Sequence, residues 1–472
     1  MACLVQVHQS LPGSLLRAWQ NLGRSRPRRH HRHHQAALRH GRYGAFPGRR
    51  HRGQPLHLLP LPPACRAPAR RGRPRLQSAA RDFLADMQDN KVYMPTDKKS
   101  NNFGASPAIL VVDFFCSVTV DVATELGIPA YCFFICCAET LAIFLYLPVL
   151  HAQSTASFRD MGAEIVRVPG IPSFPAMHCF KPLMDRHDVA YRAFLRVSPY
   201  LCRSQGIIVN TFRSLEPRPA DAISVGLCTP PGLPTPPVYC IGPLIKAEEV
   251  GVKRSRECLA WLDTHPKASV VFLCFGSRSL FSANQTRELA IGLEASGKRF
   301  LWVVRSPRRD INDPVKKLDK LPEPDLDALL PEGFLERTKG TGLVVKSWAP
   351  QRDVLAQDAV GAFVTHCGWN SVLETVMAGM PMLAWPLYAE QRVNRVFLEK
   401  ELGLAVAVEG YDKEVVQADE VASKMRWMME SDGGRVLRER TLAAMRLGKE
   451  ALIPGGESVV TLTQLVESWM AS

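Results

Sequence analysis

The chain has 472 residues, of which 46% are hydrophobic, so it has the composition of a globular protein and is too long for one ordinary core. Its formal net charge of +14 comes from residues 1–80, which hold 16 Arg, no Lys and no acidic residue. The other 392 residues carry 43 basic and 45 acidic side chains, a net charge of −2. The charge of this larger part therefore gives no support to nucleic-acid or membrane binding.

The first 80 residues do not have the pattern of a folded segment. Residues 24–75 contain no apolar periodicity long enough to build a helix or strand. Three interpretations compete: a basic arm for nucleic acid or a membrane surface, an Arg-rich transit segment, and a GC-rich coding region translated out of frame. We prefer the third, because Arg without Lys, together with Ala, Pro, Gly and His, is what GC-rich codons give in a wrong frame. We expect residues 1–80 to be poorly ordered.

The 13 Cys are scattered without a CxxC pair, which predicts free thiols in a reducing compartment and neither a disulfide framework nor a zinc site. The apolar stretch 128–150 is long enough to suggest a transmembrane span. Glu139 at its centre, with Pro129 and Pro148 near its ends, favours a strand followed by a buried helix instead.

Strands and helices alternate after residue 108. Residues 108–115 form a continuous apolar strand, 117–126 a helix ended by Gly127, and 128–134 the next strand. This alternation predicts an α/β fold with a parallel sheet covered on both faces. Asp113 lies near the end of the first of these strands, where ligands bind in open α/β sheets. The alternative role of Asp113 is to cap a helix or form a turn.

The first half closes with one more strand and a loop. Residues 206–211 are a predicted strand, the Pro- and Gly-rich residues 217–237 are predicted to form a surface loop, and residues 238–244 follow. The charged residues 245–257 follow, and we place the domain boundary there.

The second half repeats the alternation. Strands are predicted at 268–275, 299–304 and 342–345, with a helix from about 283 to 292. The first strand runs into Gly276 and Ser277, a turn that can approach a phosphate closely, although a lone Gly-Ser pair is a weak signal.

The most informative stretch is 348–391. The apolar strand 360–365 ends in His-Cys-Gly-Trp-Asn-Ser, and a helical pattern follows at once. A strand, a tight turn and a helix N-terminus present free N–H groups and a positive dipole end to an anion. Glu374 nearby is a poor phosphate ligand but a good acceptor for two sugar hydroxyls. The local pattern therefore predicts a nucleotide-sugar site.

The same stretch resembles the signature box of the plant family-1 UDP-dependent glycosyltransferases. It matches at Trp-Ala-Pro-Gln (348–351), His-Cys-Gly-Trp-Asn-Ser (366–371), Glu374 and Glu390-Gln391. The resemblance implies that Trp348 stacks on the base and that the Ala349 backbone pairs with the uracil edge. It further assigns Gln351 and Glu374 to the ribose, Ser277, His366, Asn370 and Ser371 to the phosphates, and Trp369, Glu390 and Gln391 to the sugar. Gln391 and the context of residues 331–334 resemble members that transfer glucose from UDP-glucose to flavonoids or phenols.

The resemblance also implies a fold and a mechanism. The fold is of the GT-B type, with two facing Rossmann-like domains and the active site between them. The reaction is an inverting hexosyl transfer to a small hydroxylated acceptor, with UDP-glucose as a substrate and with no cofactor or metal. Asp113 inherits the role of orienting a catalytic His. That His lies in a Gly-His turn near the start of family members, and no residue here matches it: Ser14 stands at about the right place, and His57 comes too late.

The resulting domain prediction has four parts: an anomalous basic segment 1–80, an acceptor-binding domain 81–245, a UDP-sugar-binding domain 246–455, and a helix 456–472 that returns to the first domain. We expect a cytoplasmic monomer without nucleic-acid or membrane partners. Two alternatives remain open. One is a UDP-sugar-binding remnant that lacks the general base, and the other is a nucleic-acid-binding protein that uses the basic segment.

Overall fold

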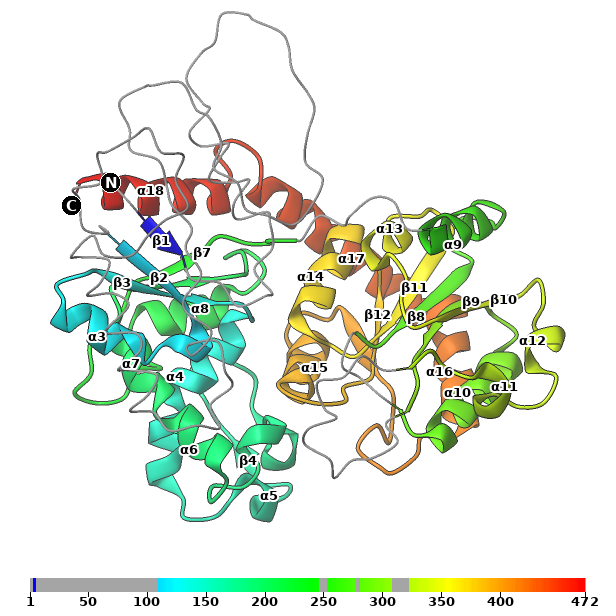
Figure 1. Cartoon of the computed structure of the whole chain (residues 1–472), viewed down its shortest axis with the longest axis horizontal. Coiled ribbons are helices and arrows are strands. Elements are labelled where there is room, and N and C mark those ends of the chain that lie inside the picture. The colour runs from blue at the N-terminus through cyan, green and yellow to red at the C-terminus, as the bar shows by residue number, and fades with distance from the viewer. Residues whose placement is uncertain (1–2, 6–108, 246–252, 277–280, 308–321, 472) are drawn as a thin grey trace, which may run out of the picture.

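The computed structural model describes residues 3–5, 109–245, 253–276, 281–307 and 322–471. They form two α/β halves that lie side by side, each built on its own parallel sheet (Figure 1). The predicted α/β fold with two parallel sheets is confirmed. The division at residue 245 stays a prediction, because residues 246–252 lie outside the described part.

The first sheet has the strand order β1-β2-β3-β6-β7, and all its neighbouring strands are parallel. Its strands are β1 (Cys3–Val5), β2 (Ile109–Asp113), β3 (Ala130–Phe134), β6 (Gly206–Val209) and β7 (Val238–Cys240). The central strands β2, β3 and β6 are buried along their whole length, as expected for continuous apolar runs covered on both faces. A small antiparallel pair, β4 (Ile165–Val166) and β5 (Phe174–Pro175), stands apart from this sheet.

Among the described residues up to 245, six segments are α-helices and three are short 3-10 helices. They are η2 (Phe114–Cys116), α3 (Thr119–Glu125), α4 (Ala138–Gln153), α5 (Phe158–Met161), η3 (Ala176–His178), η4 (Lys181–Leu183), α6 (Val189–Leu195), α7 (Val197–Arg203) and α8 (Pro217–Ser224). The predicted strand and buried helix within 128–150 are confirmed as β3 and α4. No helix in the described ranges is long and apolar enough to cross a membrane.

The second sheet has the order β10-β9-β8-β11-β12-β13, again entirely parallel. Its strands are β8 (Val270–Cys274), β9 (Arg299–Val304), β10 (Gly342–Lys346), β11 (Val360–Thr365), β12 (Met382–Ala384) and β13 (Ala405–Ala407). Its helices are α9 (Lys253–Asp263), α10 (Ala283–Ser296), α11 (Leu326–Leu329), α12 (Phe334–Arg337), α13 (Gln351–Leu355), α14 (Trp369–Ala378), α15 (Gln391–Lys400), α16 (Ala418–Glu430) and α17 (Asp432–Ala451).

The last helix, α18 (Glu457–Ala471), belongs to the first half by its packing. Figure 1 shows this helix, at the C-terminal end of the chain, lying across the first sheet. Leu462, Leu465 and Trp469 share one buried cluster with side chains of β2, β3 and β6. The Ser458 hydroxyl donates to the carbonyl of Gly242. The chain therefore crosses between the halves twice.

One expectation needs correction. Residues 217–237 are not all loop, because α8 occupies Pro217–Ser224. Its two prolines fall in the first turn, where a helix tolerates them because no intrahelical N–H bond is lost. The side chain of Ile223 in the same helix is buried. Within residues 1–80 the structure describes Cys3–Val5, which pair in register with Ile109–Val111. The other residues of that segment lie outside the described part of the chain.

Candidate functional site

The turn between β11 and α14 is held in an unusual shape by a distant side chain. Cys367 has a left-handed backbone with φ of 64°, which is uncommon for a residue other than glycine. The side-chain amide of Asn394, on α15, donates to the Cys367 carbonyl over 2.9 Å. This bond fixes the conformation that brings the chain from the strand into the helix N-terminus.

The helix that follows offers its first backbone N–H groups to a ligand. Gly368 is the N-cap of α14, and no side chain caps this end. The first N–H groups of a helix have no intrahelical partner, and the helix dipole makes this end positive. Asn370 is exposed and Ser371 is nearly buried in the first turn. The N-terminus of α14 is therefore suited to an anion.

His366 lies between two glycines. A β-carbon placed at Gly276 would lie 2.7 Å from His366 Nε2, and one placed at Gly368 would lie 2.5 Å from the same atom. The turn after β8 and the turn after β11 thus meet at this imidazole. Ser277 itself lies outside the described residues, so its predicted contact with phosphate stays a prediction.

Burial sets the charge of His366. Loss of hydration lowers its pKa to about 4, so the imidazole is neutral at physiological pH. Its Nδ1 atom has no hydrogen-bond partner among the described residues. A neutral imidazole can donate one hydrogen bond to a ligand, but it does not bring a positive charge to the site.

Gln351, Ser371 and Glu374 come together across two helices. The Gln351 side-chain Nε2 donates to Ser371 Oγ over 3.0 Å and to Glu374 Oε2 over 2.7 Å. Gln351 opens α13 and the other two lie on α14, so the pattern predicted from the sequence is assembled in space. This network holds the Glu374 carboxylate in a fixed orientation.

A cavity of about 220 Å³ opens beside this network. Trp348 lies on its wall with 41% of its surface exposed, and the left-handed Ser347 precedes it, with φ of 67°. The cavity is lined by residues at the ends of β8 and β9, in the segment after β10, and on or near α10, α13 and α14: Cys274, Phe275, Gly276, Phe281, Thr286, Trp302, Val303, Val304, Arg305, Ser347, Trp348, Ala349, Gln351 and Glu374. Four of the predicted site residues, Trp348, Ala349, Gln351 and Glu374, therefore share one wall.

Arg305 brings a positive charge to this cavity, and it was not among the site residues predicted from the sequence. Its Nη1 donates to the carbonyl of Gly276 over 3.0 Å, at the turn that touches His366. Arg305 directly follows the buried strand β9. Its place at the carboxyl end of a parallel strand is the one signal that could have identified it.

Trp369 makes a contact between the two halves. Its indole is 3% exposed, and Nε1 donates to the Asn210 carbonyl of the first half over 2.7 Å. The side chain therefore joins the two halves, and the expected contact of Trp369 with the sugar stays a prediction. The backbone N–H of Trp369 lies in the first turn of α14, where N–H groups have no intrahelical partner.

Glu390 and Gln391 lie at the start of α15. Glu390 lies beside Cys136 of the first half, with Sγ and Oε1 3.8 Å apart, and burial raises its pKa. Gln391 Oε1 accepts hydrogen bonds from the N–H groups of Leu387 and Tyr388, both over 2.9 Å. The side chain of Gln391 is 2% exposed, and its expected contact with the sugar stays a prediction.

Asp113 ends β2 and is 5% exposed. Its Oδ1 accepts from the N–H of Phe115 over 2.9 Å, so it caps the short helix η2, as the alternative interpretation of this residue predicted. Phe115, next to it, is 62% exposed. Ser14 and His57, considered above for the missing base, lie outside the described residues. Within the described ranges no group of three His, Cys, Asp or Glu side chains is placed to hold a metal ion.

Comparison with known proteins gives a consistent assignment. A family model described as "UDP-glucoronosyl and UDP-glucosyl transferase" matches residues 247–423. A phloretin 2'-O-glucosyltransferase of Malus domestica is 46% identical over 398 residues, which cover 82% of this chain and 81% of that protein. UDP-glycosyltransferase 88F3 of Pyrus communis is 47% identical over 373 residues, 77% of each chain.

A solved structure agrees over most of the chain. Phytolacca americana UGT2, in complex with UDP-2fluoro-glucose and pterostilbene, superimposes with a TM-score of 0.74 at 34% identity, covering 88% of this chain and 87% of that one. The expected GT-B fold is confirmed by this similarity. Extensive identity to these relatives, together with the assembled signature residues, shows that the chain belongs to the plant family-1 UDP-glycosyltransferases.

Proposed function

We propose that this enzyme transfers glucose from UDP-glucose to a hydroxyl of a small flavonoid or phenol, with inversion at the anomeric carbon. One observation carries the proposal: a cavity lined by an exposed indole and a fixed carboxylate, with Gln351 of the same lining hydrogen-bonded to Ser371 in the first turn of α14. The relatives named for glucosylating phloretin and for binding UDP-2fluoro-glucose with pterostilbene support the donor and the acceptor class.

The nucleoside end of the donor occupies the wall built by Trp348 and Glu374. The exposed indole provides a flat face on which uracil stacks, and the buried backbone of Ala349 pairs with the edge of the base. Glu374, held by Gln351, accepts hydrogen bonds from the two ribose hydroxyls. An ionised carboxylate accepts hydrogen bonds only, so it favours the diol over a phosphate.

The diphosphate lies at the N-terminus of α14. Backbone N–H groups, the Ser371 hydroxyl and the Asn370 amide donate to its oxygens, together with neutral His366 and Ser277. Arg305 adds a positive charge in the cavity lining. Fixed donors aimed at the leaving diphosphate stabilise the charge that develops there as the sugar bond breaks.

The sugar extends from the diphosphate toward Glu390 and Gln391. In the reaction, the acceptor oxygen bonds to C1 of glucose while the bond from C1 to the UDP oxygen breaks, and the hydroxyl proton passes to a general base. The exposed ring of Phe115, beside Asp113, offers an aromatic face for the acceptor. Asp113 orients the base, and no residue is assigned to that base because none matches the Gly-His turn.

The first test measures UDP-glucose transfer to a panel of phloretin, other flavonoids and simple phenols. The full chain is compared with a version whose residues 1–80 are replaced by those of the Malus relative. Turnover of either version with UDP-glucose supports the proposed function. Absence of product from both versions, despite binding of UDP-glucose and acceptor, would contradict it. Turnover by the replaced version alone locates the missing base in the N-terminal segment.

The second test concerns the donor cavity. Glu374→Ala should raise the Kd of UDP about tenfold, since it removes a charged hydrogen-bond acceptor. The control is Glu294→Ala, which removes an exposed ion pair with Arg337 on the same half. Equal UDP affinity of the two variants would show that Glu374 does not bind the ribose.

A second candidate function follows from the missing Gly-His turn: a protein that binds UDP-sugar without transferring it. It requires UDP to raise the melting temperature while no product forms with either N-terminus. We also expect a cytoplasmic monomer, which size-exclusion chromatography with light scattering and localisation of a tagged full chain would check.

A further inference from the structure

A polar contact outside the donor cavity joins the two halves around Tyr411. This residue follows β13, and its phenol oxygen lies 2.7 Å from Nδ1 of His178, at the end of η3 in the first half. Arg395 Nη2, on α15, donates to the same oxygen over 3.0 Å. Because the oxygen accepts from Arg395, its own proton is available to His178, and we assign Nδ1 of His178 as the acceptor.

The surroundings keep His178 in the neutral form that this bond needs. Burial, followed by the charges of Arg395, Arg392 and Lys400, lowers its pKa to about 4, and Asp412 opposes these charges only in part. A protonated His178 could not accept the phenol proton. The contact is therefore intact at neutral pH.

Two arginines of α15 pack on the Tyr411 ring. The guanidinium carbons of Arg392 and Arg395 lie 5.9 and 5.2 Å from the ring centroid. Arg395 is 8% exposed and forms an ion pair with Glu399 over 2.8 Å. Arg392 Nη1 reaches across to the carbonyl of Met177 over 3.1 Å. Cation–π and charged hydrogen bonds in such a partly buried place are stronger than on the open surface.

Residues 176–183 of the first half and the start of α15 also meet through their backbones, at the sugar end of the site. The N–H of Lys181 donates to the carbonyl of Ala389 over 3.2 Å. Ala389 has a left-handed φ of 53°, which costs free energy for a residue with a β-carbon, so its conformation depends on such contacts. Glu390 and Gln391 follow directly in the chain.

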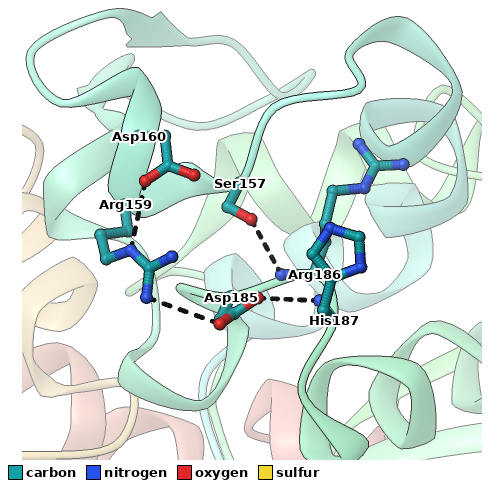
Figure 2. Close-up of polar contacts among 6 residues, drawn as sticks. All are labelled: Ser157, Arg159, Asp160, Asp185, Arg186 and His187. Atoms are coloured by element: carbon teal, nitrogen blue, oxygen red, sulfur yellow. Dashed lines mark hydrogen bonds and ion pairs between the residues drawn. The ribbon is translucent and has the colours of Figure 1, made fainter.

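Residues 176–183 are also held against the rest of the first half. Figure 2 shows the contacts that tie Asp185 and Arg186, just after this segment, to the start of α5. Arg159 Nη1 lies 3.5 Å from Asp185 Oδ2, and the N–H of Arg186 donates to Ser157 Oγ over 3.2 Å. Phe180 packs on Phe144 of α4, with ring centroids 5.1 Å apart. Movement of the segment therefore requires movement of the first half.

We propose that Tyr411 is a positioning residue that, through His178 and Arg395, holds the first half against α15 and so fixes Glu390 and Gln391 for the donor sugar. The sugar-binding part rests on the proposed function. The nucleoside wall of the cavity comes from the second half alone, so UDP affinity is independent of this contact. Tyr411 lies outside the signature box, and it acts through other residues without touching the sugar.

The test is Tyr411→Phe, which removes the hydroxyl and keeps the ring between the arginines. We expect kcat/KM for UDP-glucose to fall about tenfold, as for loss of two partly buried hydrogen bonds, while the Kd of UDP stays within twofold. The amide hydrogen of Lys181 should exchange faster. His178→Ala should act similarly, and the double variant should lose no more than about either single variant, because both remove one contact.

Tyr239→Phe is the matched control, since this half-buried tyrosine of β7 lies in the first sheet, packed on Tyr131. It should leave kcat/KM and Lys181 exchange unchanged. Unchanged kcat/KM in Tyr411→Phe, additive losses in the double variant, or a parallel loss of UDP affinity would each overturn the proposal. If no version of the enzyme turns over, the proposed function fails, and the exchange of Lys181 alone decides whether Tyr411 holds the halves together.

Discussion

The imidazole of His366 lies so close to Gly368 that a β-carbon on this glycine would lie 2.5 Å from Nε2. Real side chains essentially never approach so closely, so position 368 has room for hydrogen alone while the imidazole keeps its place. Its backbone, with φ of −65°, would accept any residue. The glycine is therefore required by its neighbour and not by its own conformation.

Gly368→Ala should consequently displace His366 and weaken donor binding. We expect the Kd of UDP to rise about tenfold or more, because a buried donor at the diphosphate is lost. Isothermal titration of UDP measures this effect. The control is Gly127→Ala, at a left-handed turn with open space around it, which should lower the melting temperature but leave UDP affinity unchanged. Unaltered affinity in Gly368→Ala would exclude His366 from the diphosphate site.

Trp369→Phe should destabilise the fold without weakening donor binding. The substitution leaves the buried Asn210 carbonyl without its 2.7 Å donor, and we expect the free energy of unfolding to fall by about 2 kcal/mol. Denaturant unfolding gives the stability, and the KM for UDP-glucose gives the donor interaction. A rise in KM at unchanged stability would restore the indole as a sugar ligand.

Glu139→Met should stabilise the protein, more so at high pH. Both carboxyl oxygens of Glu139 are buried without a hydrogen-bond partner in the described structure, and burial together with the nearby Glu216 raises its pKa well above the usual range. As pH rises above about 4.3, the unfolded chain releases the Glu139 proton while the folded chain keeps it, so stability falls. Removing the carboxyl removes this loss.

The expected gain is about 1–3 kcal/mol at pH 8 and smaller at pH 5, from unfolding curves at both values. The comparison variant is Glu164→Met, on the exposed surface of the same half, which should change stability little at either pH. A gain that is equal at pH 5 and pH 8 would show that the Glu139 carboxyl is ionised in the folded state.

UDP should protect Cys274 from alkylation. This thiol is half-buried and lines the donor cavity, so bound nucleotide covers it. Site-resolved mass spectrometry after iodoacetamide treatment should show severalfold slower labelling of Cys274 with saturating UDP. Cys367 provides the internal comparison, because complete burial raises its pKa and should prevent labelling until the protein unfolds. Equal labelling of Cys274 with and without UDP would place the nucleotide elsewhere.

Strong local patterns located much of the second half. β9 and β11 have the predicted limits, since continuous apolar runs in a parallel sheet are bounded by polar turns. The helix predicted from 283 to 292 continues to Ser296, where the left-handed Gly297 ends it. The clustering of Gln351 with Glu374 also follows from the signature box, because the motif brings two turns to one end of the sheet.

The contacts between residues far apart in the sequence could not be predicted. Asn394 supports the Cys367 turn from 27 positions away, and Tyr411 meets His178 across 233 positions. No local periodicity carries information about such pairs, because they depend on how α15 is placed against both sheets. The hydrogen bond of Trp369 was not predicted for the same reason: its partner, Asn210, belongs to the other half.

The packing of α18 determines which pieces of this enzyme can be exchanged with a relative. A chimera joined once near residue 245 would combine the acceptor half of one protein with the last helix of another. Leu462, Leu465 and Trp469 would then pack against the sheet of a different protein. The interchangeable unit is discontinuous: the first half together with α18. A swap with two junctions, the second placed near Gly455, keeps each hydrophobic interface with its own partner surface.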